Sequence, residues 1–199
     1  MGLLGRPPRN GTAMLEREIK LRFDSASDAR AAVMAAGATP LNARRFQDDY
    51  LFDTDGEDLR RQRYALRIRS DGPRSLLTFK GPMQPGPMKL REELETVVSS
   101  GDVLRQVLQR LGLRAWFRYQ KYREEFARED VVIAVDETPI GTFVEIEGTE
   151  AGITAAAAAL GRTTGDYILD SYYGLFVRYR DALGFRGTDM VFDEPDRAS

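Results

Sequence analysis

From Met14 to Phe23 the chain reads MLEREIKLRF, in which apolar and charged side chains alternate with a period of two. Successive side chains of a β-strand point to opposite faces, so this stretch predicts a strand with one apolar face and one charged face. The same alternation recurs in four further segments bounded by turn residues, which predicts a mainly β skeleton. These segments are Ala65 to Ser70, Leu76 to Lys80, Leu90 to Val97 and Thr142 to Gly148.

Segments with helical spacing of apolar residues lie between the expected strands, and three of them are followed by a glycine. We expect helices over residues 25–36, 100–111 and 150–160, and a fourth over 171–183. Both ends of the chain are rich in glycine and proline and lack periodicity. We therefore predict a flexible leader over 1–13, one domain over 14–183 and a flexible tail over 184–199.

The composition excludes several classes of binding partner and catalytic site. The chain has 199 residues with 29 basic and 31 acidic side chains, a balance that gives no reason to expect nucleic acid or a membrane as partner. It contains no cysteine and no histidine, which excludes cysteine nucleophiles, histidine bases, disulfides and zinc sites built on those residues. No signal peptide or apolar run of membrane length is visible, so we expect a cytoplasmic protein.

Charges of one sign are grouped along the chain. Residues 60–69 contain five arginines and no acid, whereas residues 136–150 contain five acids and no base. Such a face could simply meet solvent on one side of an antiparallel sheet. Arginine and lysine on rigid strands, however, suit phosphate oxygens, and paired glutamates suit Mg²⁺ or Mn²⁺. Together the two groups predict a metal-assisted polyphosphate site.

An ordered series of motifs resembles the CYTH family, named for class IV adenylate cyclase and thiamine triphosphatase and part of the triphosphate tunnel metalloenzymes. The resemblance begins with Glu16-x-Glu18-x-Lys20 and covers about residues 14 to 179. The remaining motifs are Gln47-Asp48-Asp49-Tyr50, Leu66-Arg67-Ile68-Arg69, Thr78-Phe79-Lys80-Gly81-Pro82, Arg91-Glu92-Glu93-Leu94-Glu95, Lys121-Tyr122-Arg123, and Asp136 followed by residues 141–147, GTFVEIE.

The resemblance implies an α+β, mainly β fold: a closed eight-stranded antiparallel β-barrel, lined inside by charge, with helices packed outside. It implies that Glu16, Glu18, Lys20 and Lys80 are catalytic. The implied substrate-binding residues are Lys20, Arg67, Arg69, Lys80, Arg91, Lys121 and Arg123. The implied metal ligands, for Mg²⁺ or Mn²⁺, are Glu16, Glu18, Asp136, Glu145 and Glu147. Glu93 and Glu95 are expected either to pair within the tunnel wall or to touch the substrate.

The activity that the resemblance implies is metal-dependent processing of a small triphosphate. We favour hydrolysis of inorganic tripolyphosphate, thiamine triphosphate or a nucleoside triphosphate. Conversion of ATP to cyclic AMP and pyrophosphate uses nearly the same charged residues and remains an alternative. A module that binds polyphosphate without turnover is a third, and a homodimer is left open.

Two smaller interpretations concern aromatic and C-terminal residues. Trp116, Phe117 and Tyr119 are interpreted as core residues rather than as a surface for stacking a base. Tyr172 and Tyr173 are interpreted as packing residues. Some relatives carry a lysine near the C-terminal end of the tunnel, where this chain offers only Arg178 and Arg180.

Overall fold

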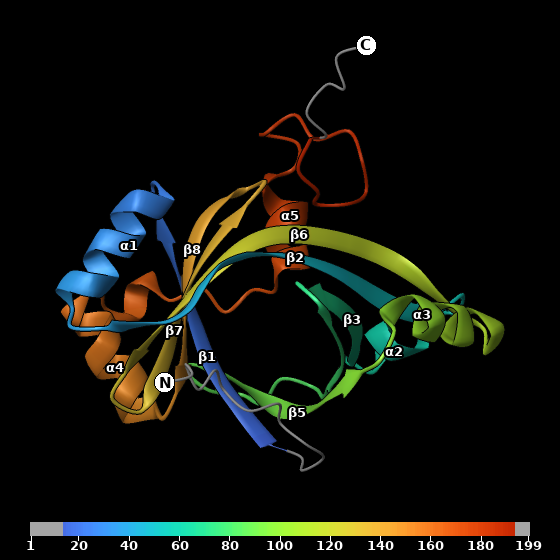
Figure 1. Ribbon diagram of the computed structural model, residues 1–199, viewed down its shortest axis with the longest axis horizontal. Coiled ribbons are helices and arrows are strands. Elements are labelled where there is room, and N and C mark those ends of the chain that lie inside the picture. The colour runs from blue at the N-terminus through green and yellow to red at the C-terminus, as the bar shows by residue number, and fades with distance from the viewer. Residues whose placement is uncertain (1–13, 194–199) are drawn as a thin grey trace.

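The computed structural model describes residues 14–193, and its strands form a closed barrel (Figure 1). The strand order around the barrel is β1-β5-β4-β3-β2-β6-β7-β8, with every neighbouring pair antiparallel. The closed eight-stranded antiparallel barrel predicted from the sequence is thus confirmed. The strands are β1 (Met14–Phe23), β2 (Thr39–Thr54), β3 (Ala65–Asp71), β4 (Arg74–Lys80), β5 (Lys89–Val98), β6 (Leu113–Arg128), β7 (Val131–Thr138) and β8 (Gly141–Gly148).

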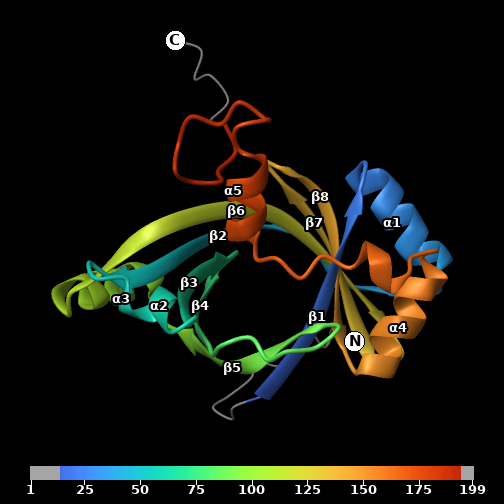
Figure 2. The same ribbon diagram turned by 180° about the vertical axis from the view of Figure 1, so that it is seen from behind.

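The helices lie on the outside of this barrel (Figures 1 and 2). Three of them begin at a hydroxyl side chain that accepts a backbone N–H: Ser25 caps α1, Ser100 caps α3 and Thr149 caps α4. The fourth predicted helix is capped by Ser171 but ends at Tyr179, four residues earlier than expected. The elements are α1 (Ala26–Ala35), α2 (Asp58–Arg61), α3 (Gly101–Arg110), α4 (Glu150–Ala159), the 3₁₀ turn η1 (Thr164–Asp166) and α5 (Tyr172–Tyr179).

The apolar faces of the strands pack outward onto these helices. Ile19 of β1 and Ile146 of β8 are fully buried in a cluster with Val33 of α1 and Ile153 of α4. A second cluster joins β6 and β8 to α5, and a third places Leu108 of α3 against β2 and β3. Burial of apolar area at about 25 cal/mol per Å² makes these interfaces the main source of stability.

Because the apolar faces are covered from outside, the charged faces of the strands point into the barrel. Glu16, Glu18 and Lys20 of β1 are 6%, 7% and 2% exposed. These values exclude the simpler interpretation in which the charged face of this strand meets solvent. Inward charge can be tolerated only if opposite charges neutralise each other, which is the arrangement found below.

The segment after α5 differs from the expected flexible tail. Met190 is fully buried, its N–H donates to Arg118 O, and its carbonyl accepts from Gln120 N. Two backbone hydrogen bonds to β6 and one buried apolar side chain therefore attach this part of the tail to the barrel. Residues 1–13 and 194–199, for which a flexible leader and tail end were predicted, lie outside the described residues.

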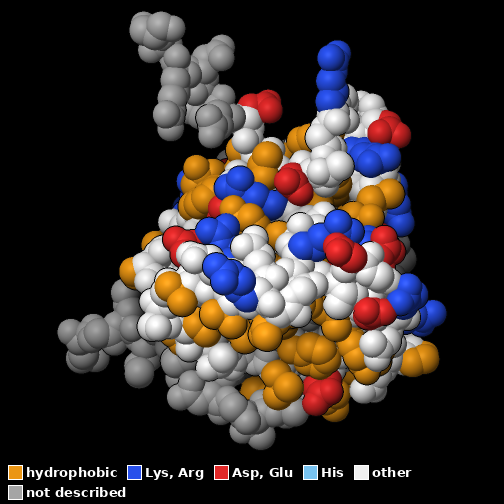
Figure 3. Space-filling view, turned by 90° about the vertical axis from the view of Figure 1, so that its right-hand side faces the viewer, with side chains coloured by type: hydrophobic (Ala, Val, Ile, Leu, Met, Phe, Trp, Pro, Cys, Tyr) orange, Lys and Arg blue, Asp and Glu red, His pale blue; other side chains and the backbone are white. Residues whose placement is uncertain are grey.

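The outer surface near α3 is partly apolar. Val103, Val107 and Leu111 are exposed there, and Leu94 is exposed on β5. Figure 3 shows this side of the molecule, with apolar side chains gathered in its lower part. Within residues 14–193, no helix has the length and apolar character needed to cross a bilayer.

Candidate active site

The barrel encloses a cavity of about 500 Å³ whose lining residues come from every strand except β7 and from the start of α5. This volume is within the range of small-molecule sites. Every predicted site residue except Asp136 lines it. The lining members of the predicted set are Glu16, Glu18, Lys20, Arg67, Arg69, Lys80, Arg91, Lys121, Arg123, Glu145 and Glu147.

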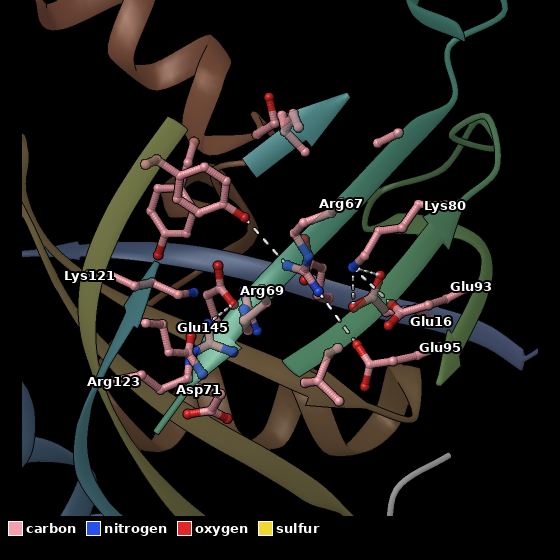
Figure 4. Close-up of a pocket in the computed structure, with 18 of the residues that line it drawn as sticks. Glu16, Arg67, Arg69, Asp71, Lys80, Glu93, Glu95, Lys121, Arg123 and Glu145 are labelled. Atoms are coloured by element: carbon pink, nitrogen blue, oxygen red, sulfur yellow. Dashed lines mark hydrogen bonds and ion pairs between the residues drawn. The ribbon is translucent and has the colours of Figure 1, made fainter. Parts of the chain in front are cut away.

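One wall of the cavity brings Lys80 of β4 against two carboxylates. Lys80 Nζ lies 2.6 Å from Glu16 Oε2 and 2.8 Å from Glu93 Oε2 (Figure 4, right). Burial raises the pKa of Glu16; Lys80 opposes this, while the nearby carboxylates of Glu18 and Glu93 raise it further. Acids that crowd together in this way favour the arrival of positive charge.

A second group links β1, β8 and β6. Lys20 Nζ lies 3.0 Å from Glu18 Oε1 and 3.2 Å from Glu145 Oε1, and Glu145 also pairs with Arg123. Burial alone would lower the pKa of Lys20, but Glu145 and Glu18 outweigh it and raise that pKa. For Glu18 and Glu145, burial alone would raise the pKa. Neighbouring cations outweigh burial and hold the pKa of each carboxyl well below its ordinary value.

Asp136 lies behind this wall rather than on it. Its carboxylate is fully buried and accepts hydrogen bonds from Lys121 Nζ at 2.8 Å, Arg123 Nε at 2.7 Å and Tyr172 Oη at 2.6 Å. The ammonium groups of Lys20 and Lys121 lie 5.3 Å and 4.9 Å from the centre of the Tyr172 ring. The predicted metal ligand is therefore surrounded by donors of this chain, and it fixes the position of two predicted substrate-binding cations.

Arg67 and Arg69 of β3 lie between the two walls in Figure 4. Arg69 Nε donates to Asp49 Oδ1 at 2.8 Å, and Arg67 Nη2 donates to the Thr78 hydroxyl at 3.0 Å. Arg67 also has Asp49 and Glu95 at 3.5 Å each. The two guanidinium groups are thus held on the barrel wall and face the cavity, as a clamp for phosphate oxygens requires.

Lys89 is a lining residue that the sequence did not single out. It is the first residue of β5, lies opposite Glu18 in the β1–β5 ladder, and places Nζ 2.6 Å from Glu18 Oε1. Burial lowers its pKa to about 8, and Glu18 is the carboxylate that opposes this shift. Strand parity can find it, since it shares a face with Arg91, but the predicted strand begins at Leu90, one residue after it.

Aromatic side chains also reach the cavity. Trp116, Tyr119 and Tyr173 line it, although Trp116 and Tyr119 were expected to belong only to the core. Arg60 lies 4.2 Å from the centre of the Trp116 ring. Tyr172 and Tyr173 do pack as expected, but the Tyr172 hydroxyl additionally bonds Asp136, which sequence spacing could not reveal.

The C-terminal arginines do not replace a tunnel lysine. Arg178 pairs with Asp170 at 2.8 Å, and Arg180 pairs with Asp181 at 3.2 Å. Neither of the two lines the barrel cavity. The chain contains only four lysines, however, and all of them line the cavity: Lys20, Lys80, Lys89 and Lys121.

Comparison with known proteins agrees with this geometry. A model of the CYTH domain matches residues 14–169. A protein of Methanocaldococcus jannaschii named "Putative adenylate cyclase" is 30% identical over 135 residues, which cover 67% of this chain and 77% of that protein.

Solved structures show the same fold. A "putative adenylate cyclase" of Vibrio parahaemolyticus superposes with a TM-score of 0.72 at 19% identity, covering 83% of this chain and 99% of that one. A "putative adenylyl cyclase" from Hippeastrum, described as having a dominant triphosphatase activity, superposes with a TM-score of 0.62 at 17% identity, covering 84% and 96%.

Proposed function

The chain belongs to the CYTH domain family, and from this premise we propose that it is a divalent-metal-dependent enzyme that hydrolyses a small triphosphate. The observation that carries the proposal is the cavity itself. It gathers the seven predicted substrate-binding cations, which come from β1, β3, β4, β5 and β6, around one space. A triphosphate is the kind of ligand whose several negative charges match such a lining.

The carboxylates of the cavity fit a hard cation. Glu18 and Glu147 face each other in the β1–β8 ladder, and Lys20 pairs there with Glu145. Within residues 14–193, no three acids already converge on one point, and cations of the chain pair with several of them. Mg²⁺ does not require three, since one or two carboxylates plus substrate phosphates usually bind it.

We assign Glu16, Glu18, Glu145 and Glu147 to the metal side. The predicted metal role of Asp136 is not retained in this proposal, because Lys121, Arg123 and Tyr172 already surround its carboxylate. A bound divalent ion would supply neutralisation of phosphate charge and polarisation of the reacting phosphoryl group.

The chain's own residues then position and neutralise the substrate. Arg67 and Arg69 hold phosphate oxygens in one orientation, and Lys20 and Lys80 stabilise the negative charge that develops as the terminal P–O bond breaks. The carboxylates of the metal side, which face the same space, orient the attacking water and accept its proton. None of these steps needs histidine or cysteine.

Cyclisation of ATP is a second candidate, favoured by one feature of the site. Trp116, Tyr119 and Tyr173 line the same cavity as the cations and offer aromatic surfaces for a nucleobase. In that reaction the ribose 3′ oxygen would attack the α-phosphorus and pyrophosphate would leave.

Phosphorus NMR separates these activities. The protein is incubated with Mg²⁺ or Mn²⁺ and, separately, with inorganic tripolyphosphate, thiamine triphosphate or ATP. We expect orthophosphate to be released, and the rate of its release from each compound ranks the substrates. Pyrophosphate together with cyclic AMP from ATP would replace the hydrolase proposal by the cyclase. Binding without any turnover would refute both and identify a polyphosphate-binding module.

A further inference from the structure

The distribution of lysine in this chain is unusual. Of its 29 basic residues only four are lysine, and each of the four lines the barrel cavity. Lysine and arginine differ chemically: the ammonium is a compact charge on a flexible stem, whereas the guanidinium is a planar fork that binds carboxylates bidentately. Three of the lysines belong to the predicted site, and Lys89 remains without a role.

Lys89 occupies a place where positive charge is needed. Its Nζ is 2.6 Å from Glu18 Oε1, and both side chains are buried, at 6% and 7% exposure. Glu18 is one of the carboxylates that the proposed function assigns to the divalent cation. The ammonium of Lys89 and the cation would therefore compete for the same carboxylate.

Lys20 contacts the same oxygen but is held differently. Its ammonium also pairs with Glu145, so loss of the contact with Glu18 alone leaves it one carboxylate partner. Lys89, in contrast, makes a single ion pair among residues 14–193, and that pair is with Glu18. Loss of that pair would leave the Lys89 ammonium facing the cavity, beside Arg91 and Lys80.

We propose that Lys89 is a built-in counter-ion of Glu18, which the divalent cation displaces when it binds and which is then released into the cavity toward the polyphosphate. This inference rests on the proposed function. It makes metal binding weak in the absence of polyphosphate, because the cation must displace an ammonium group. It also makes metal and polyphosphate bind cooperatively, since the anion stabilises the released charge.

A lysine is suited to this exchange in a way that arginine is not. A guanidinium would hold the Glu18 carboxylate through two parallel hydrogen bonds and would be harder to displace. The flexible four-carbon stem of lysine allows the ammonium to move while the backbone of β5 stays in its ladder with β1.

The direct test measures Mn²⁺ binding without polyphosphate, by the electron paramagnetic resonance signal of free Mn²⁺. Lys89→Met removes the competing charge, and we expect its Kd for Mn²⁺ to fall at least about tenfold, or about 1.4 kcal/mol. Lys89→Arg should show no tighter binding. Arg110→Met, at the exposed end of α3, makes the same change in net charge outside the cavity and should match the wild type.

A second measurement uses the wild-type chain and does not depend on the folding of a variant. Protein labelled with ¹³C-lysine gives signals from only four side chains, all of them in the cavity, and the Lys89 signal is identified by its loss in Lys89→Arg. Titration with Mg²⁺ should shift the Lys89 signal at the concentration at which the ion binds, while the Lys80 signal changes less.

The outcomes separate the inference from the function on which it rests. Equal Mn²⁺ affinity in wild type and Lys89→Met, or a Lys89 signal that does not respond to Mg²⁺, would refute the counter-ion role alone. Weaker Mn²⁺ binding in Lys89→Met would also refute it, because Lys89 would then support the ion. Absence of Mn²⁺ binding in every variant, with or without tripolyphosphate, would refute the metal dependence of the proposed function and the inference with it.

Discussion

Replacing Asp136 by asparagine removes one negative charge from a buried carboxylate that links β6, β7 and α5. The residue is 0% exposed, and its carboxylate accepts hydrogen bonds from Lys121, Arg123 and the Tyr172 hydroxyl. Burial would raise the pKa of Asp136, but Arg123 and Lys121 hold it below its ordinary value, so the group is charged in the folded state near neutral pH. The amide leaves those two cations buried without their shared partner.

The magnitude follows from breaking a buried ion pair while leaving the partner charged, which costs about 3 to 5 kcal/mol. In a chain of this size each kcal/mol lowers Tm by about 2 to 4 °C, so Asp136→Asn should melt about 6 to 20 °C below wild type. Tyr172→Phe removes only one hydrogen bond to the same carboxylate and should cost about 1.5 to 3 kcal/mol.

Thermal and urea unfolding of both variants, followed by circular dichroism, measure these losses. Because Tyr172 acts through Asp136, the double variant should lose less than the sum of the single losses. Mn²⁺ affinity should change less in Asp136→Asn than in Glu145→Gln if Asp136 positions cations rather than binding the ion. An Asp136→Asn protein within about 1 kcal/mol of wild type would refute the assignment of a buried, fully charged cluster.

Three further predictions concern the cavity. Glu145→Gln should lower metal-dependent phosphate release at least about a hundredfold while tripolyphosphate still binds. Glu92→Gln, on the exposed face of β5, makes the same chemical change outside the cavity and should match wild type. Equal activity of both variants would remove Glu145 from the metal side. In EDTA, calorimetric affinity for tripolyphosphate, corrected for protonation of the ligand itself, should fall as pH rises through about 8, because burial lowers the pKa of Lys121 and Lys89 to about 8 and their charge is lost as pH rises. A pH-independent affinity between pH 7 and 9.5 would contradict this. Trp116→Ala should raise KM for ATP and thiamine triphosphate about tenfold and leave KM for tripolyphosphate unchanged, and a parallel change in all three would show that Trp116 only packs.

Local alternation was sufficient to predict five of the eight strands, β1, β3, β4, β5 and β8, and which of their residues share a charged face. It did not identify β2, β6 and β7, which only the family resemblance implied. Glu16, Glu18 and Lys20 share a face through strand parity alone, and the structure shows that face inside the barrel. The direction of the charged face could not be derived from one strand. It depends on which side the helices cover, and that depends on packing of the whole domain.

The residues that were missed owe their place to tertiary structure. Tyr172 is on α5, and only the docking of that helix against β6 and β8 brings its hydroxyl to Asp136. Asp49 was within a quoted motif, but its role as partner of Arg69 appears only when β2 and β3 are paired. That all four lysines line one cavity becomes visible only once the barrel is folded.

The closure of the barrel has a consequence for how the chain folds as it is synthesised. β1 emerges from the ribosome first but needs β8, the last strand, to complete one of its two ladders, including the Lys20 and Glu145 pair. Such long-range pairing is slow, and an open sheet edge attracts other nascent chains. Until closure, however, the concave face of the open sheet carries hydrated lysine, arginine and glutamate instead of the oily side chains of an ordinary barrel interior. We therefore expect the charges that line the cavity of the finished protein also to limit aggregation of the unfinished one.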